Sequence, residues 1–244
     1  MRSPTYVLLA ASLITLISSN TFADWSCKSS SSQAALVELY TSQGCSSCPP
    51  ADRWLSALKD RDDLWTEVVP VAWHVTYWDY LGWRDPFGRR ENDQRQRRMA
   101  AAVGSGVYTP GVFLNRGEYQ RWRVTPPQRV DTLSMDVGVL SAKSAGAAVA
   151  VSFEPAAGLS FESPRAEIVY LRANQKTDVG RGENRGRNLK HDFVAGAPER
   201  VELRFEAGRW IGTASKSPEA DDVAVALWVL DQRGDYVQAT GGWL

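Results

Sequence analysis

The segment GCSSCPPAD, residues 44–52, contains two of the three cysteines in this 244-residue chain, Cys45 and Cys48. A spacing of two residues lets both sulfurs meet within one turn, so the pair can close as a disulfide or open as a dithiol. At a helix N-terminus, unpaired N–H groups and the helix dipole stabilise a thiolate, which is the nucleophile of thiol–disulfide exchange. In that chemistry Cys45 attacks and Cys48 resolves the mixed disulfide.

The elements around the pair are expected to be a buried strand before it and an amphipathic helix after it. Residues 34–41 are a short, mostly apolar run with β-forming side chains. Residues 51–65 begin with apolar positions at helical spacing. A second buried strand is expected over residues 67–75. The pair therefore lies at a strand-to-helix turn, where the bare spacing becomes a more specific signal.

Further along the chain, the pattern predicts a helix over residues 89–103 and two short strands around a turn at 115–117. Prolines at the start and apolar residues on one face predict another helix over 126–140. The expected order over residues 34–140 is thus β-α-β-α-β-β-α. Such an alternation is typical of an α/β domain.

The pattern changes after a small, polar stretch at residues 141–148, which we expect to be a domain boundary. Beyond it, short strand-like runs are separated by Gly, Pro and Asp. The sequence therefore predicts a first domain over 24–140 and a small all-β, sandwich-like domain over 148–244.

Thr109 and Pro110 precede a predicted strand, in the order that would place them opposite the cysteine turn. A cis proline there would form a rigid bend that offers backbone groups to a disulfide-bearing substrate. An ordinary trans proline in a turn is the alternative, because most X-Pro bonds are trans.

The topology, CSSC and YTP before a strand resemble the thioredoxin fold. More narrowly, VELYTSQGCSSCPPAD, HVTYWDYLGWRDPF, YTPGVFLN and GENRGRNL resemble a secreted bacterial family with a thioredoxin-like domain, the domain of unknown function 1223 family. The likeness extends from about Leu36 to the C-terminus. By this resemblance Cys45 and Cys48 match the redox pair and Pro110 the cis-proline. The family name leaves activity and substrate open.

This chain departs from ordinary thioredoxins in two respects. They commonly carry proline between the cysteines, whereas here Pro49 and Pro50 follow the pair. Because a residue before proline disfavours the α region, a regular helix is expected only from Pro50, with the cysteines in an irregular turn. Thioredoxins also carry a buried acid on the preceding strand. Glu38 is the candidate, although one residue out of register, which would turn it to the other face unless a bulge restores it.

Other interpretations of the pair stay open. The disulfide could be a structural staple in an exported, non-catalytic binding or assembly protein. Copper handling by Cys45, Cys48 and His74 is a third possibility, because thiolates and imidazole suit Cu(I). No zinc site is expected, since only His74, His191 and Cys27 remain as further good ligands. His74 ends the second strand and is expected to be a hydrogen-bonded structural residue, with proton transfer as the alternative.

The first 23 residues predict a secretory signal peptide. Arg2 is followed by an apolar run over residues 6–17 and by Ala23, which suits signal peptidase. Cleavage after Ala23 would leave residues 24–244 in the periplasm or outside the cell. No stable membrane anchor would remain, because the apolar run is shorter than the roughly 20 residues that span a bilayer.

The charge balance argues against a nucleic-acid partner. Lys and Arg together number 28, as do Asp and Glu. The arginine-rich stretch at residues 180–191 includes Glu183, so an ion-pair network or a solvated hairpin is expected there. The aromatic residues of 76–88 are expected to pack over one end of the sheet, with a groove wall as the alternative. The expected partners are proteins or small molecules that carry a thiol or disulfide, and thiol–disulfide exchange needs no organic cofactor.

Overall fold

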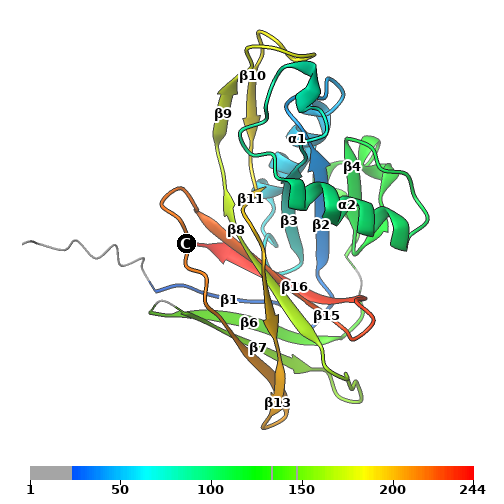
Figure 1. Ribbon diagram of the computed structural model, residues 1–244. Helices are drawn as coiled ribbons and strands as arrows, with labels where there is room; N and C mark the ends of the chain where they lie inside the picture. The colour runs from blue at the N-terminus through cyan, green and yellow to red at the C-terminus, as the bar shows by residue number, and fades with distance from the viewer. Residues whose placement is uncertain (1–23, 133, 147) are drawn as a thin grey trace, which may run out of the picture.

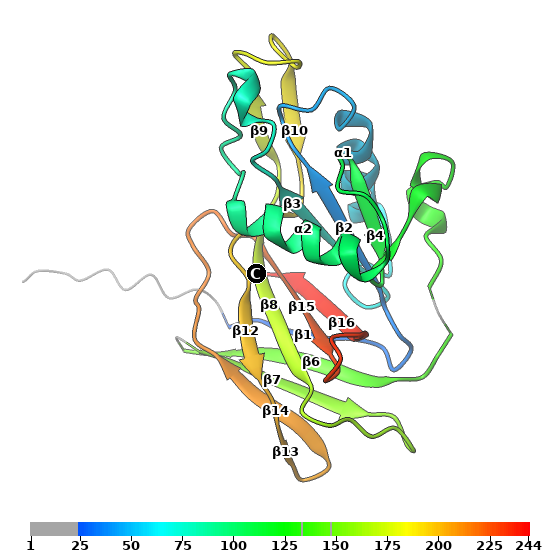
Figure 2. The ribbon, with the colours of Figure 1, turned by 45° about the vertical axis from the view of Figure 1, so that its right-hand side comes forward.

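The computed structural model describes residues 24–132, 134–146 and 148–244, and the predicted signal peptide lies outside them. The described chain is mixed α/β and mostly strands, with two α-helices. Its strands form a nine-stranded sheet, a five-stranded sheet and a two-stranded ribbon. Figures 1 and 2 show both helices against the upper part of the nine-stranded sheet and the five-stranded sheet below it. Within the described ranges, no helix has the length and apolarity needed to cross a membrane.

The helix-bearing part of the nine-stranded sheet is formed by strands that lie close together in the sequence. They are β2 (Ala35–Thr41), β3 (Val68–His74), β4 (Gly111–Leu114) and β5 (Gly117–Glu118). β2 pairs parallel with β3 and antiparallel with β4, which pairs antiparallel with β5. β2 and β3 are buried along their whole length, as is typical of parallel strands covered on both faces.

Two helices and several short 3-10 turns accompany these strands. They are α1 (Pro49–Ser56), η1 (Ala57–Asp60), η2 (Asp79–Leu81), α2 (Arg90–Ala102), η3 (Gln120–Arg123) and η4 (Pro127–Arg129). The two α-helices lie on opposite sides of the sheet (Figures 1 and 2). α2 matches the prediction, whereas α1 is shorter than the predicted 51–65. The α-helix is followed by the 3-10 turn η1, which ends before Arg61, a residue with an extended backbone. The Arg61 guanidinium forms a salt bridge with Asp63, with 2.6 Å between Nη2 and Oδ2.

The start of α1 corrects an expectation about the prolines. Cys48 has α-helical backbone angles, φ −76° and ψ −37°, although a proline follows it. Its carbonyl oxygen accepts hydrogen bonds from the N–H groups of Ala51 and Asp52, at 2.9 and 3.1 Å. Prolines at the first helical positions cost little, because those N–H groups would lack intrahelical partners. The helix therefore begins at Pro49, directly after the cysteine pair.

The C-terminal half contributes further strands to the same sheet. Its strands in this sheet are β8 (Arg165–Arg172), β11 (Val194–Ala195), β12 (Glu199–Glu202), β15 (Ala224–Leu230) and β16 (Tyr236–Trp243). The order is β16-β15-β8-β11-β3-β2-β4-β5, with β12 paired to β8. The short strand β11 makes the connection, because it pairs parallel with β3 and antiparallel with β8.

The five-stranded sheet packs against this extension. It has the order β1 (Ser26–Lys28), β6 (Gly138–Ala145), β7 (Ala148–Pro155), β14 (Arg209–Ala214) and β13 (Arg204–Glu206). β15 shows how the two parts share a core, because Val225 and Leu227 pack between the sheets. Ala226 and Trp228 alternate with them and join the core beneath the helices. The described residues of the predicted linker 141–148 belong to the β6–β7 hairpin, and strands from both halves share the nine-stranded sheet.

The helix predicted over residues 126–140 is wrong. Among the described residues of this range, the one helical segment is the short turn η4, and β6 begins at Gly138. The N–H groups of Val137 and Gly138 instead bond to the carbonyl of Ser31, at 3.0 and 3.2 Å. Gly138 has φ 105°, which no helix contains. Residues with helix-like spacing thus adopt an extended conformation, because Ser31 in the N-terminal segment accepts their hydrogen bonds.

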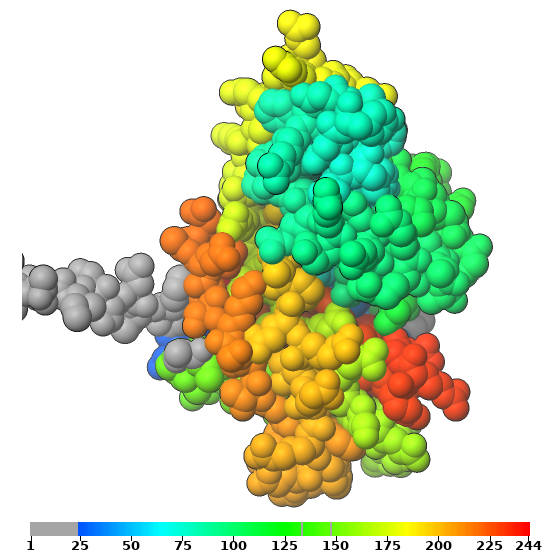
Figure 3. Space-filling model, viewed as in Figure 1, coloured from blue at the N-terminus to red at the C-terminus, as the bar shows by residue number. Residues whose placement is uncertain are grey.

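A two-stranded ribbon projects from the C-terminal half towards the cysteine pair. It consists of β9 (Gln175–Asp178) and β10 (Asn188–His191), and residues 179–187 form its tip. In Figure 3 the tip, in yellow, rises beside the teal loop of residues 76–88.

Candidate functional site

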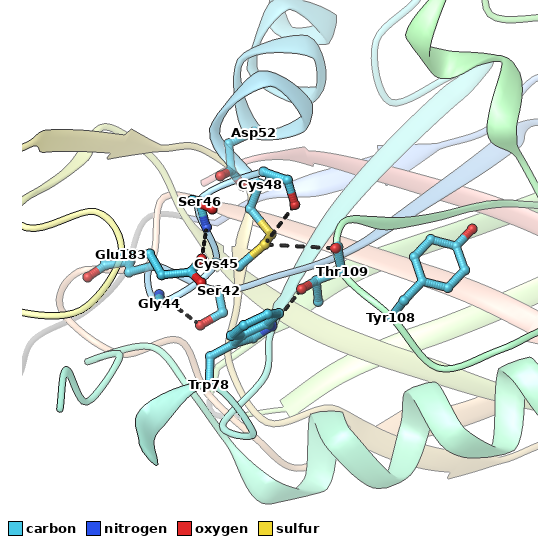
Figure 4. The surroundings of a disulfide bond; sticks show 12 residues. Ser42, Gly44, Cys45, Ser46, Cys48, Asp52, Trp78, Tyr108, Thr109 and Glu183 are labelled. Atoms are coloured by element: carbon cyan, nitrogen blue, oxygen red, sulfur yellow. Dashed lines mark hydrogen bonds between the residues drawn. A yellow bond between two sulfur atoms is a disulfide. The ribbon is translucent and has the colours of Figure 1, made fainter. Parts of the chain in front are cut away.

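The cysteine pair lies between β2 and α1 and is closed as a disulfide, as predicted (Figure 4). The two Cα atoms are 5.5 Å apart, and the Cys48 N–H donates to the Cys45 carbonyl at 3.3 Å. Cys45 is 1% exposed and Cys48 is 0% exposed, whereas Ser46 and Ser47 face solvent. Both cysteines are therefore buried, whereas the two serines between them are accessible to a partner.

Cys45 Sγ has two polar neighbours. The Ser47 hydroxyl lies 3.3 Å from the sulfur and is the donor, since a disulfide sulfur has no hydrogen. The Thr109 carbonyl oxygen lies 3.8 Å away, and the Thr109–Pro110 bond is cis (Figure 4). Trp78 Nε1 donates to Thr109 Oγ1 at 2.7 Å. The structure thus brings Cys45, Thr109 and Pro110 together.

A groove of about 370 Å³ opens beside the disulfide. It is lined by Ser47, Pro50, Thr109, Pro110, Trp122 and Arg123. The guanidinium of Arg123 lies 4.8 Å from the centre of the Trp122 ring. The groove therefore offers an apolar wall and a positive charge next to the backbone that contacts Cys45.

The tip of the β9–β10 ribbon holds the cysteine loop from a distant part of the sequence. Asn184 is fully buried and donates to the carbonyls of Gln43 and Cys45, each at 2.9 Å. Its own oxygen accepts from Arg187 at 2.7 Å. The Glu183 carboxylate accepts the Ser46 N–H at 2.9 Å (Figure 4). A solvated hairpin or internal ion pairs were expected here, so the contact with the cysteine loop was missed. The sequence signal that could have indicated it was the resemblance of the segment GENRGRNL to the DUF1223 family.

The aromatic loop of residues 76–88 packs against the same turn. Trp83 Nε1 donates to Gln43 Oε1 at 3.0 Å. Trp78 leaves no room for a side chain at Gly44, because an added Cβ would lie 2.8 Å from Trp78 Cβ. This is the expected packed loop, and it closes around the cysteine turn.

Glu38 is committed to a buried ion pair. Its Oε1 accepts from Trp73 Nε1 at 3.0 Å and from Arg95 Nε and Nη2 at 3.0 and 2.8 Å. None of its hydrogen bonds within the described residues reaches a cysteine. Glu38 also lies three residues before the end of β2, roughly 10 Å along the strand. This position gives it no role as an acid beside the disulfide.

His74 belongs to a network of buried polar side chains. Its Nδ1 lies 2.7 Å from Asp85 Oδ2, which also accepts the Gln43 N–H at 2.8 Å. The His191 ring packs against it with centroids 4.7 Å apart, and His191 Nδ1 lies 3.6 Å from Asp52 Oδ1. This network of side chains therefore links the first turn of α1 to the cysteine loop. His74 has the hydrogen-bonded structural position expected for it.

A model of the family described as protein of unknown function (DUF1223) matches residues 36–230. This chain belongs to that family. A crystal structure of a structural genomics target from Agrobacterium tumefaciens is similar to it, with a TM-score of 0.63 and 26% identity. The likeness covers 86% of this chain and 93% of that one. Among curated proteins, none matches this chain.

The match to DUF1223 includes the disulfide, the groove and the ribbon tip, whereas Cys27 lies outside it. Cys27 is a free, buried thiol in β1, and burial raises its pKa to about 12. It therefore stays protonated at neutral pH and is not a nucleophile there. Among the described residues of this DUF1223 protein, no three His, Cys, Asp or Glu side chains are placed to hold a metal ion.

The His74–Asp85 pair should make stability depend on pH. Burial disfavours a charged imidazole, but Asp85 outweighs it and raises the pKa of His74. Burial also opposes the Asp85 carboxylate, but His74 outweighs it and lowers the pKa of Asp85. The stability that protonated His74 contributes is fully present below the pKa of histidine in the unfolded chain, about 6.5. This stability is lost as the pH rises through the higher pKa of His74 in the folded protein. The Asp85 contribution is present above about 3.9 and is lost as pH falls through its folded pKa.

Urea denaturation over a pH series measures this dependence. The free energy of unfolding should decrease as pH rises above about 6.5, and Asp85→Asn should remove most of that slope. An unchanged slope in the variant would show that His74 and Asp85 are not the source.

Proposed function

We propose that this chain is an exported, thioredoxin-like thiol–disulfide oxidoreductase that uses Cys45 and Cys48. The observation that carries the proposal is the disulfide at the start of α1, with the Thr109 carbonyl 3.8 Å from Cys45 Sγ. A helix N-terminus stabilises a thiolate. The groove beside Pro110 gives a substrate segment a place to lie against the reacting sulfur.

The proposed exchange can start from the disulfide form. A substrate thiolate attacks Cys45 Sγ, the Cys45–Cys48 bond breaks, and Cys48 leaves as a thiolate that takes up a proton. A second substrate thiolate then attacks the mixed disulfide and releases Cys45 as a thiolate. The substrate dithiol is oxidised by two electrons, and the cysteine pair is reduced. In the opposite direction, Cys45 attacks a substrate disulfide and Cys48 resolves the intermediate.

A structural disulfide in a binding or assembly protein is the second candidate. Burial of both cysteines favours it, because a covered disulfide is protected from exchange. The two functions differ in the reduction potential of the pair. An enzyme should have a potential near that of its compartment, whereas structural bridges lie below about −300 mV.

Trapping of a mixed disulfide tests the proposal. The Cys48→Ser chain, residues 24–244, is incubated with glutathione disulfide or with a disulfide-linked peptide. Cys45 should form a persistent mixed disulfide, because the resolving thiol is absent. Mass spectrometry identifies the modified residue, and equilibration of the unsubstituted chain with redox buffers gives its potential.

The double variant Cys45→Ser, Cys48→Ser is the matched control and retains Cys27. It should form no adduct, since Cys27 stays protonated at neutral pH. The oxidoreductase proposal is wrong if the Cys48→Ser chain forms no adduct and the native disulfide resists mild reductant. That outcome would support the structural role.

A further inference from the structure

Glu183 places a negative charge at the cysteine pair from outside the strand–helix unit. It lies at the ribbon tip, 137 residues from Ser46 in the sequence, and its carboxylate accepts the Ser46 N–H at 2.9 Å. Ser46 directly follows Cys45, so the carboxylate lies roughly 5 to 7 Å from the place where a Cys45 thiolate would form. Figure 4 shows Glu183 extending towards the turn beside Cys45.

This contact is held in place by the neighbouring residue. The buried Asn184 side chain bonds to the carbonyls on both sides of Gly44. The backbone that carries Glu183 is therefore fixed to the cysteine loop. The Ser46 side chain, together with the Ser46 N–H, lowers the pKa of Glu183, and the carboxylate is charged at neutral pH. An exposed side chain thus gains a defined position at the site.

We propose that Glu183 is a positioning residue that disfavours the Cys45 thiolate and thereby slows its attack. Two effects act in the same direction. The carboxylate repels the negative charge that forms on Cys45 Sγ. It also accepts a backbone N–H next to Cys45, so this donor is not free to turn towards a thiolate.

Other charged groups around the pair do not duplicate this contact. They are Asp52 in α1, Asp85 in the aromatic loop, Arg123 in η3, and Arg181, Arg185 and Arg187 at the ribbon tip. The Asp52 carboxylate lies 3.6 Å from His191 Nδ1, and the Asp85 carboxylate lies 2.7 Å from His74 Nδ1. Arg187 is directed to Asn184, and Arg123 lies over Trp122. Glu183 alone among them bonds to the segment between the cysteines.

The tuning role rests on the proposed function, but its electrostatic basis can be measured separately. In the Cys48→Ser chain, Cys45 can be titrated by the ultraviolet absorbance of its thiolate and by the pH dependence of its alkylation. Adding Glu183→Gln removes the charge and keeps an acceptor for Ser46. We expect the midpoint to fall by about 0.5 to 1 pH unit, a roughly three- to tenfold gain in thiolate below the midpoint.

Glu162→Gln in the same background is the matched control, because Glu162 is an exposed acid in the loop between β7 and β8. It should leave the midpoint unchanged. A salt titration of the chain that retains Glu183 does not depend on how the variant folds. Added salt screens the repulsion, so its midpoint should move towards that of Glu183→Gln.

The outcomes separate this inference from the proposed function. An equal or higher midpoint in Glu183→Gln, or a midpoint without salt dependence, would overturn the role of Glu183 even if mixed disulfides form. A lower midpoint, in a protein that forms no mixed disulfide and whose native disulfide resists mild reductant, would support the electrostatic contact and reject the oxidoreductase.

Discussion

Replacing Arg95 with methionine should lower the free energy of unfolding by about 3 to 5 kcal/mol. Arg95 binds Glu38 and also donates to Glu167 Oε2 at 2.7 Å. The guanidinium lies 4.6 Å from the Trp73 ring centre and 5.2 Å from that of Trp228. Methionine fills part of this space but leaves the buried Glu38 carboxylate and the mostly buried Glu167 carboxylate without their cation, which is the costly way to break such an ion network.

Urea denaturation at neutral pH measures this loss. Arg98→Met is the matched control, because Arg98 is exposed on the same helix, and it should change stability by less than about 0.5 kcal/mol. Adding Glu38→Gln and Glu167→Gln to Arg95→Met should restore part of the loss by removing the unpaired charges. If the triple variant is no more stable than Arg95→Met, loss of packing rather than charge would explain the effect.

Replacing Asn184 with alanine should destabilise the protein by about 1 to 3 kcal/mol and expose the disulfide to reductant. The substitution removes both hydrogen bonds and leaves the Gln43 carbonyl without its partner, whereas the Cys45 carbonyl still accepts the Cys48 N–H at 3.3 Å. Each unsatisfied buried group costs about 1 to 3 kcal/mol. The cysteine loop also loses its attachment to the ribbon, so dithiothreitol should reduce the disulfide faster than in the unsubstituted chain.

Asn188→Ala is the matched control for this prediction. Asn188 lies on the same ribbon and donates to Asp178 at 2.7 Å, but the pair is exposed. Its removal should cost less than about 0.5 kcal/mol and leave the reduction rate unchanged. If the two variants behave alike, Asn184 does not hold the cysteine loop in solution.

The elements next to the cysteine pair could be predicted because their signals are local. Helical spacing and apolar runs indicated β2, α1, β3 and α2, and a glycine turn indicated the β4–β5 hairpin. Cys48 and Cys45 are near neighbours in the chain, so their spacing alone allowed the disulfide to be expected. Each of these features depends on contacts within a few residues.

The elements that were predicted wrongly depend on partners far along the chain. The stretch before β6 has helix-like spacing, yet Ser31 and the N-terminal segment supply its hydrogen bonds. The C-terminal strands likewise carry no local sign of the sheet they enter, because nothing in a strand's own residues specifies which sheet it joins. β11 decides this by pairing with both β3 and β8.

By itself, the sequence determined a closely spaced cysteine pair at a strand–helix turn, because spacing and periodicity are properties of neighbouring residues. Only the tertiary structure decided what surrounds the pair. It directed Glu38 to Arg95, and it brought Thr109, Asn184 and Glu183 to the cysteine loop. Contacts between residues 64 to 139 positions apart leave no local pattern, since they arise only when distant elements pack together.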